Sequence, residues 1–129
     1  MTVDEQVKYW IKAAENDLPV LENLFQGKHY LWCMFVGHLI LEKIIKAHFV
    51  KDNKQNPPRT HDLLRLIEKT NLSINEDQKL FLDEINDYQL EARYPDYKFS
   101  IQTSLNFEKT KQKLENIKAI FEWLKSQLT

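Results

Sequence analysis

The chain contains very little cysteine, glycine and proline: one Cys, two Gly and four Pro among 129 residues. A lone cysteine excludes both a disulfide framework and a cysteine-based metal site within the chain. Cys33 lies inside an apolar run, which indicates a small buried side chain rather than a reactive thiol. No glycine-rich phosphate loop is present, so the common loop that cradles nucleotide phosphates is excluded.

The sequence also lacks a long apolar segment and an excess of either charge. The longest apolar stretch, Leu31 to Leu41, is interrupted by His38 and is too short to cross a bilayer. The acidic first residues show no signal peptide, so we expect a cytoplasmic protein. With 18 basic and 19 acidic residues spread along the chain, the net charge is −1. No global field therefore draws the protein to nucleic acid or membrane, and any RNA contact has to be local.

Hydrophobic residues make up 43% of the chain and charged residues 29%, which is typical of a soluble globular protein. The apolar residues recur at helical spacing and do not alternate, so we predict an all-α protein. No linker or repeat divides the chain. We therefore expect a single domain, residues 1–129, built from about five helical segments.

Capping signals and breaks define the first segment. Thr2 with Glu5 forms a capping box at its start, and Gly27 is a natural stop. Pro19 falls inside the apolar pattern, where it removes a backbone hydrogen bond. We therefore expect either a kink near Asn16 or two consecutive helical pieces.

The second segment runs from about His29 to Lys51 and is apolar nearly all round, which predicts the most buried helix. Because such a helix needs more cover than its neighbours easily supply, we also predict a homodimer. Thr60 is expected to cap a short third helix. Asn75 with Gln78 opens a fourth helix as a capping box. A fifth helix is expected from about Gln102 to Gln127.

A carboxylate stands within the most apolar segment. Glu42 lies one turn after His38, and the two side chains could hydrogen-bond across that turn. Buried carboxylates are rarely unpaired, so Glu42 is expected to have a partner. It belongs either to a polar site on the bundle or to an internal ion pair, with Lys46, His38 or Arg93 as the partner.

Two short clusters could bind a ligand. Residues 59–63, Arg-Thr-His-Asp-Leu, place a histidine in the first turn of a helix beside an arginine and an aspartate. Residues 93–97, Arg-Tyr-Pro-Asp-Tyr, hold an arginine and two tyrosines on a loop stiffened by proline, which suits anion binding and base stacking. A purely structural alternative for the second cluster is a salt-bridged Arg93 with the tyrosines packed on the bundle.

Motifs for self-sufficient catalysis are missing. The four histidines have no zinc-like spacing, and no paired Glu-x-x-His motifs occur for a carboxylate-bridged metal site. No nucleophile stands in a recognisable arrangement with His and Asp. We therefore predict no catalytic residue, no metal and no cofactor.

Several of these motifs together resemble the HEPN domain family (higher eukaryotes and prokaryotes nucleotide-binding domain). The most specific are the Glu-Lys-x-x-Lys-Ala of residues 42–47, the Thr-His-Asp-Leu of residues 60–63 and the Arg-Tyr-Pro-Asp of residues 93–96. The resemblance implies an up-and-down bundle of about five helices that is usually dimeric. It also implies a frequent partner, a minimal nucleotidyltransferase, with which the domain forms a toxin–antitoxin pair.

The chain departs from the ribonucleases of this family. In those members an Arg and a His, four to six residues apart, meet across the dimer and cleave RNA without metal. Here residues 94–99 after Arg93 contain no histidine, and neither Arg59 nor Arg65 has one at the required distance. The ribonuclease motif of the family is therefore absent.

We predict a non-catalytic dimeric module that binds a nucleotide, an RNA-related ligand or a partner nucleotidyltransferase. The predicted ligand-binding residues are Glu42, Lys43, Lys46, His61, Arg93, Tyr94, Asp96 and Tyr97. The alternative is a divergent metal-independent ribonuclease that uses His61 as general base and an arginine of the dimer for phosphorane charge. Its arginine would be Arg93, Arg59 or Arg65.

Overall fold

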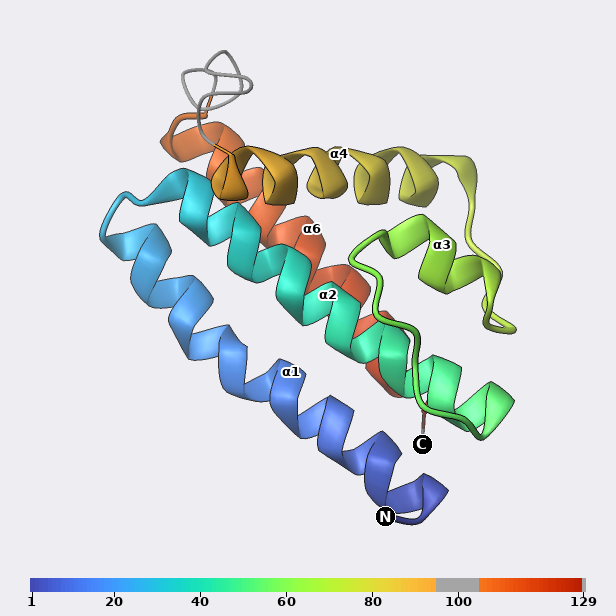
Figure 1. Cartoon of the computed structure of the whole chain (residues 1–129). Helices are drawn as coiled ribbons and strands as arrows, with labels where there is room; N and C mark the ends of the chain where they lie inside the picture. Colours follow the sequence, from blue (N-terminus) through green and yellow to red (C-terminus); the bar gives the residue numbers. More distant parts are fainter. Residues whose placement is uncertain (95–104, 129) are drawn as a thin grey trace.

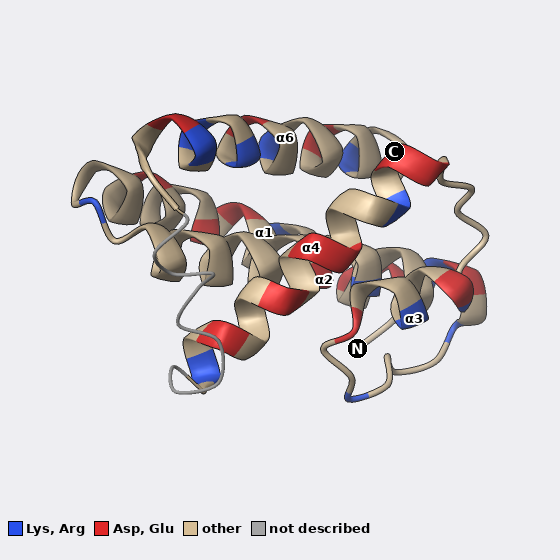
Figure 2. Ribbon diagram, turned by 90° about the horizontal axis from the view of Figure 1, so that it is seen from above, with Lys and Arg blue, Asp and Glu red and all other residues tan. Residues whose placement is uncertain are grey.

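The computed structural model describes residues 1–94 and 105–128, and helices make up most of both ranges (Figure 1). The helices are α1 (Val3–Gln26), α2 (Tyr30–Asn53), α3 (Leu63–Glu68), α4 (Glu76–Arg93) and α6 (Phe107–Ser126). No strand occurs in the described residues. Figure 2 shows mostly acidic positions along α4 and a mixture of basic and acidic positions along α6. The predicted all-α class and helical bundle are confirmed. No helix in these ranges combines the length and apolar character that a bilayer span requires.

The centre of the bundle is α2, which contacts all four of the other described helices. In Figure 1, α1 runs beside it along its length and α6 lies behind it. Sixteen of the 24 residues of α2 are buried, more than in any other described helix. The prediction that the second helix is the most buried one is confirmed.

The close packing of α2 on α6 depends on one glycine. Gly37 lies opposite Ile117, and a Cβ atom at this glycine would overlap the end of the Ile117 side chain. Both residues belong to the fully enclosed part of the bundle, where Ile117 has no exposed surface. The absence of a side chain at Gly37 therefore lets α2 and α6 approach closely at this point.

The first helix is continuous, so of the two predicted alternatives, a kink near Asn16 or two consecutive pieces, the second is wrong. Pro19 lies inside α1 and is exposed, yet helical structure continues from Val3 to Gln26. The missing backbone donor costs stability locally. Packing on both sides of the proline compensates, because Ala14 and Leu21 are fully buried. The predicted capping box is confirmed: the Glu5 backbone N–H donates to Thr2 Oγ1 over 3.1 Å.

The third helix begins two residues later than predicted. Its N-cap is Asp62, whose carboxylate accepts hydrogen bonds from the backbone N–H groups of Leu64 and Arg65. Thr60 is not the cap; its hydroxyl oxygen accepts from the backbone N–H of Asp62 over 3.2 Å. A carboxylate can accept from two donors and also favours the positive end of the helix dipole, which explains the choice of Asp62 over Thr60.

One amide side chain joins α4 to the start of α3. Asn86 Oδ1 accepts from the backbone N–H of Leu63 over 3.1 Å. Its Nδ2 donates to Asp62 Oδ1, also over 3.1 Å. The short helix α3 is therefore fixed to α4 by two hydrogen bonds at its first turn.

The remaining helix starts agree in part with the prediction. The capping box of Asn75 and Gln78 at α4 is confirmed, with the Gln78 backbone N–H donating to Asn75 Oδ1 over 2.8 Å. The last helix begins at Phe107 and not near Gln102, because Asn106 accepts from the Lys109 backbone N–H over 2.8 Å and so caps the helix.

Candidate functional site

A buried carboxylate on α2 connects two parts of the molecule. Glu42 is only 5% exposed, and each of its oxygens accepts a hydrogen bond from a basic side chain. His61 Nδ1 lies 2.8 Å from Oε1, and Lys46 Nζ lies 2.9 Å from Oε2. The prediction that Glu42 is paired is confirmed. Of its predicted partners Lys46 is correct, whereas Arg93 lies elsewhere and His61 was not foreseen.

His38 holds the backbone of His61 and not the side chain of Glu42. Its Nε2 donates to the His61 carbonyl oxygen over 2.6 Å. Its Nδ1 is 3.8 Å from Glu42 Oε1, has no hydrogen-bond partner and is fully buried. Burial lowers the pKa of His38, so this ring is neutral at physiological pH. The predicted hydrogen bond between His38 and Glu42 is therefore not formed.

Two opposing effects act on the Glu42 carboxyl group. Burial works to raise its pKa, but the hydrogen bonds from His61 and Lys46 and the charge of Lys46 outweigh burial. The net result is a pKa below the ordinary value. Glu42 is thus ionised at neutral pH and holds a fixed negative charge inside the bundle.

The imidazole of His61 is oriented by Glu42 and open to solvent. The residue precedes the N-cap Asp62 and so lies just before α3, not in its first turn as predicted. Its side chain is 52% exposed. Because Nδ1 donates to Glu42, Nε2 is the nitrogen left to accept a proton, and no hydrogen bond joins it to another described residue. A carboxylate-oriented imidazole is a competent proton acceptor.

Lys46 forms part of the wall of an open hollow between the start of α1 and the loop that follows α2. We call this space, of about 600 Å³, the Lys46 hollow. Its lining residues are Met1, Gln6, Tyr9, Trp10, Lys46, Asn56, Pro57, Pro58 and Arg59. Lys46 Nζ lies 5.3 Å from the centre of the Trp10 ring, and the Tyr9 and Trp10 rings meet edge to face at 5.3 Å. Two cations and two aromatic rings therefore border one space.

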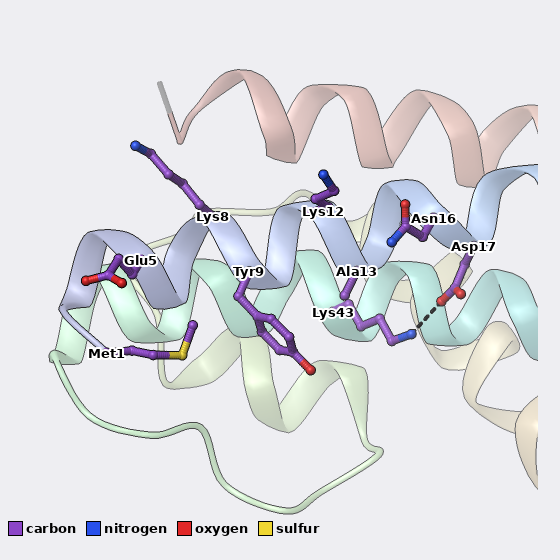
Figure 3. Close-up of a pocket in the computed structure, with 9 residues that line it drawn as sticks. All are labelled: Met1, Glu5, Lys8, Tyr9, Lys12, Ala13, Asn16, Asp17 and Lys43. Carbon is purple, nitrogen blue, oxygen red and sulfur yellow. Dashed lines mark hydrogen bonds and ion pairs between the residues drawn. The ribbon is translucent and has the colours of Figure 1, made fainter.

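A second hollow, of about 680 Å³, adjoins the first at Met1 and Tyr9 (Figure 3). It contains Lys43, whose ammonium pairs with Asp17 over 2.6 Å. In Figure 3 the side chains of Lys8 and Lys12 extend to the opposite side of α1 from Tyr9. The hollow is lined by Lys8, Lys12 and Lys43, and Asp17 balances the charge of Lys43.

Arg93 lies beside the N-terminal part of α2, away from Glu42, and Tyr94 follows it directly in the sequence. Arg93 Nε donates to Gln89 Oε1, and the guanidinium carbon is 5.3 Å from the centre of the Phe35 ring. Phe35 precedes Glu42 by seven residues on α2, which is about two turns or roughly 10 Å. Tyr94 is 62% exposed. Asp96 and Tyr97 lie outside the described residues.

The predicted ligand-binding residues therefore do not form one cluster. Glu42, Lys46 and His61 come together, Lys43 faces α1, and Arg93 with Tyr94 forms a separate group. Sequence reasoning did not include Trp10 in the site. Trp10 and Lys46 belong to different helices and are distant in the sequence, so only the packing of α1 on α2 brings them together.

These features define a small all-α bundle with a polar site on its central helix. The chain belongs to the HEPN domain family: the model of the HEPN domain matches residues 7–127. The resemblance found in the sequence is thereby confirmed. No curated protein and no solved structure matches the chain. Among the described residues, no group of three His, Cys, Asp or Glu side chains is arranged to hold a metal ion.

Proposed function

We propose that this HEPN domain is a non-catalytic module that binds a nucleotide or a similar phosphate-bearing ligand in the Lys46 hollow. One observation carries the proposal: Lys46, Arg59 and the rings of Tyr9 and Trp10 all line the same space. An arginine fork and a lysine ammonium bind phosphate oxygens, and aromatic faces stack with bases.

The charge of the hollow supports an anionic ligand. Glu42 balances the charge of Lys46, whereas no ion pair joins Arg59 to another described residue. Arg59 is exposed, so its guanidinium is available to a ligand. The volume of about 600 Å³ falls within the usual range of small-molecule sites.

The test is a calorimetric titration of adenosine and uridine monophosphates into the wild type and Arg59→Gln. We expect the substitution to weaken binding roughly 10- to 100-fold, because it removes a charge-assisted hydrogen bond. Arg65→Gln is the matched control. It removes the same charge from an exposed arginine on α3, outside the hollow, and it should bind like the wild type.

Two results would contradict the proposal. One is the absence of binding by the wild type. The other is equal weakening in Arg59→Gln and Arg65→Gln, which would indicate a general charge effect. If Arg93→Gln alone loses affinity, the ligand binds at the Arg93 group instead.

A divergent metal-independent ribonuclease is the second candidate, and one observation favours it. His61 exposes Nε2 while Glu42 orients the ring, and Arg59 stands two residues earlier on the same loop. Labelled RNA incubated with the protein in chelator tests this function. We expect no cleavage. Cleavage that disappears in His61→Ala but persists in His29→Ala would replace the binding module by this ribonuclease.

We also propose that two copies of the chain associate through the part of α2 that remains uncovered. Trp32 is 50% exposed and meets Phe35 edge to face at 5.5 Å. Arg93 lies over Phe35, and on α4 Leu90 and Tyr94 are 44% and 62% exposed. An aromatic and arginine patch of this kind is typical of the centre of a protein interface. A partner nucleotidyltransferase, and with it a toxin–antitoxin pairing, stays a prediction of the family resemblance.

A further inference from the structure

The Lys46 hollow continues into the second hollow, of about 680 Å³, which we call the Asp17 hollow. Met1 and Tyr9 line both spaces. Tyr9 is 55% exposed, so its ring forms an open boundary between the two. Each hollow by itself has the usual volume of a small-molecule site. The two together therefore offer room for a ligand that extends past Tyr9 and is larger than one nucleotide.

An ion pair fixes the polar end of the Asp17 hollow. Lys43 Nζ of α2 donates to Asp17 Oδ2 of α1 over 2.6 Å. The two side chains are 26% and 22% exposed, so most of each is packed against the protein. In Figure 3 the pair lies at the end of the hollow away from Met1. The pairing uses one carboxylate oxygen, and no described residue donates a hydrogen bond to the other, Oδ1.

The chemistry of this hollow suits a nucleoside. A carboxylate oxygen accepts from a hydroxyl group, and an acidic side chain that accepts from a ribose hydroxyl is a common means of recognising a nucleotide. The amide of Asn16, which is exposed beside Asp17, adds a further donor and acceptor. Ala13 and the Tyr9 ring provide apolar surface between Asp17 and Met1 (Figure 3). A sugar beside Asp17 and a base on Tyr9 therefore match the lining.

The charges of the Asp17 hollow admit an anionic ligand. Lys8, Lys12 and Lys43 outnumber Glu5 and Asp17 in its lining, so the hollow as a whole does not repel a phosphate that approaches from the Lys46 hollow. The carboxylate beside Lys43 nevertheless disfavours phosphate at that one point. A neutral hydroxyl group is the better partner there.

We infer that the two hollows together bind two linked ribonucleotides, with the phosphodiester at Arg59 and one ribose at Asp17. The inference rests on the proposed binding function and names the class of its ligand. Tyr9, between the hollows, stacks with a base. Asp17 Oδ1 accepts from the ribose 2′-hydroxyl, which a deoxyribose lacks. The site therefore prefers a ribodinucleotide both to a single nucleotide and to the corresponding deoxydinucleotide.

Three ligands test this preference by calorimetric titration of the wild type. They are the ribodinucleotide adenylyl-adenosine, its deoxyribose counterpart and the methyl ester of adenosine monophosphate, which has one nucleoside and the same single phosphodiester charge. We expect the ribodinucleotide to bind roughly 10-fold more tightly than the methyl ester, because stacking and the ribose contact are added. We expect a similar preference, about 10-fold, over the deoxydinucleotide, because that ligand lacks a hydrogen bond to a charged acceptor.

Two variants of α1 identify the acceptor. Asp17→Asn keeps an oxygen in place but removes its charge, so the preference for ribose should fall to about 3-fold or less. Its affinity for the methyl ester should equal that of the wild type. Glu15→Gln is the matched control: it removes a carboxylate that pairs with Lys125 over 2.8 Å, outside both hollows, and it should keep the full preference. Circular dichroism of each variant confirms that it is folded.

Several results would overturn the inference and leave the proposed function intact. The wild type would bind the methyl ester as tightly as the ribodinucleotide, or the deoxydinucleotide as tightly as the ribodinucleotide. A ribose preference that survives in Asp17→Asn, or that falls equally in Glu15→Gln, would have the same meaning. A wild type that binds none of the three ligands would instead refute the proposed function itself, and the inference would fall with it.

Discussion

Glu42→Ala is expected to lower the free energy of unfolding by about 3 kcal/mol. The substitution removes the acceptor of two hydrogen bonds and leaves the Lys46 ammonium, whose side chain is 11% exposed, without a counter-charge. It also releases the His61 ring from α2. Urea denaturation followed by circular dichroism measures the change.

A second carboxylate provides the control. Glu84 pairs with Lys113 over 2.7 Å, but its side chain is 45% exposed, so Glu84→Ala should cost less than about 1 kcal/mol. The double variant Glu42→Ala with Lys46→Met should recover much of the loss, because it no longer strands a buried charge. Equal small effects at both carboxylates would show that Glu42 is not part of the stabilising core.

The contribution of Glu42 also depends on pH with a definite sign. Its folded-state pKa lies below the ordinary value of 4.5, so its stabilisation is present above that value and is lost as pH falls through the lower folded pKa. The difference in stability between the wild type and Glu42→Ala should therefore shrink in acid below about pH 4.5. A difference that stays constant in acid would contradict the ionised state assigned to Glu42.

Trp32→Asp is expected to convert the proposed homodimer into monomers. The wild type should scatter light as twice the 15.5 kDa chain. A tryptophan at the centre of an interface commonly contributes 2–4 kcal/mol, so the dissociation constant should rise by about 30-fold or more, and a buried charge increases the effect. Light scattering over a dilution series measures the change.

Leu80→Asp is the matched control for this experiment. Leu80 is 66% exposed near the start of α4, at the opposite end of that helix from Arg93, and its substitution should leave the dimer intact. A wild type that remains at 15.5 kDa at every concentration would refute the dimer. Equal dissociation by both variants would place the interface elsewhere.

Helical periodicity and capping chemistry were sufficient to predict the fold. The apolar side chains of residues 29–51 cover nearly the whole circumference of a helix, and such a helix must be buried on several sides. Thr2 with Glu5 and Asn75 with Gln78 have cap geometry that depends on residues three apart, so local sequence predicts it well. Of the two alternatives predicted for Pro19, two separate helical pieces are wrong, because tertiary packing of α1 on α2 outweighs the local cost of the proline.

The site was predicted less completely, since its geometry depends on contacts between distant segments. Glu42 and Lys46 are one turn apart, and their pairing is a local property of α2. The pairing of Glu42 with His61 depends on the path of the loop back onto α2, which no spacing reveals. Arg93 was grouped with Glu42 on chemistry alone, whereas the crossing of α4 over α2 places it beside Phe35.

Asn86 couples the local unfolding of α3 to that of α4. An isolated helix of six residues is not stable in water, so α3 depends on its tertiary contacts for its persistence. Asn86 ties the backbone of Leu63 and the side chain of Asp62 to α4. In native-state amide hydrogen exchange, α3 and the middle of α4 should therefore exchange as one cooperative unit. The Leu63 amide would report the opening of α4 rather than fraying of the short helix to which it belongs.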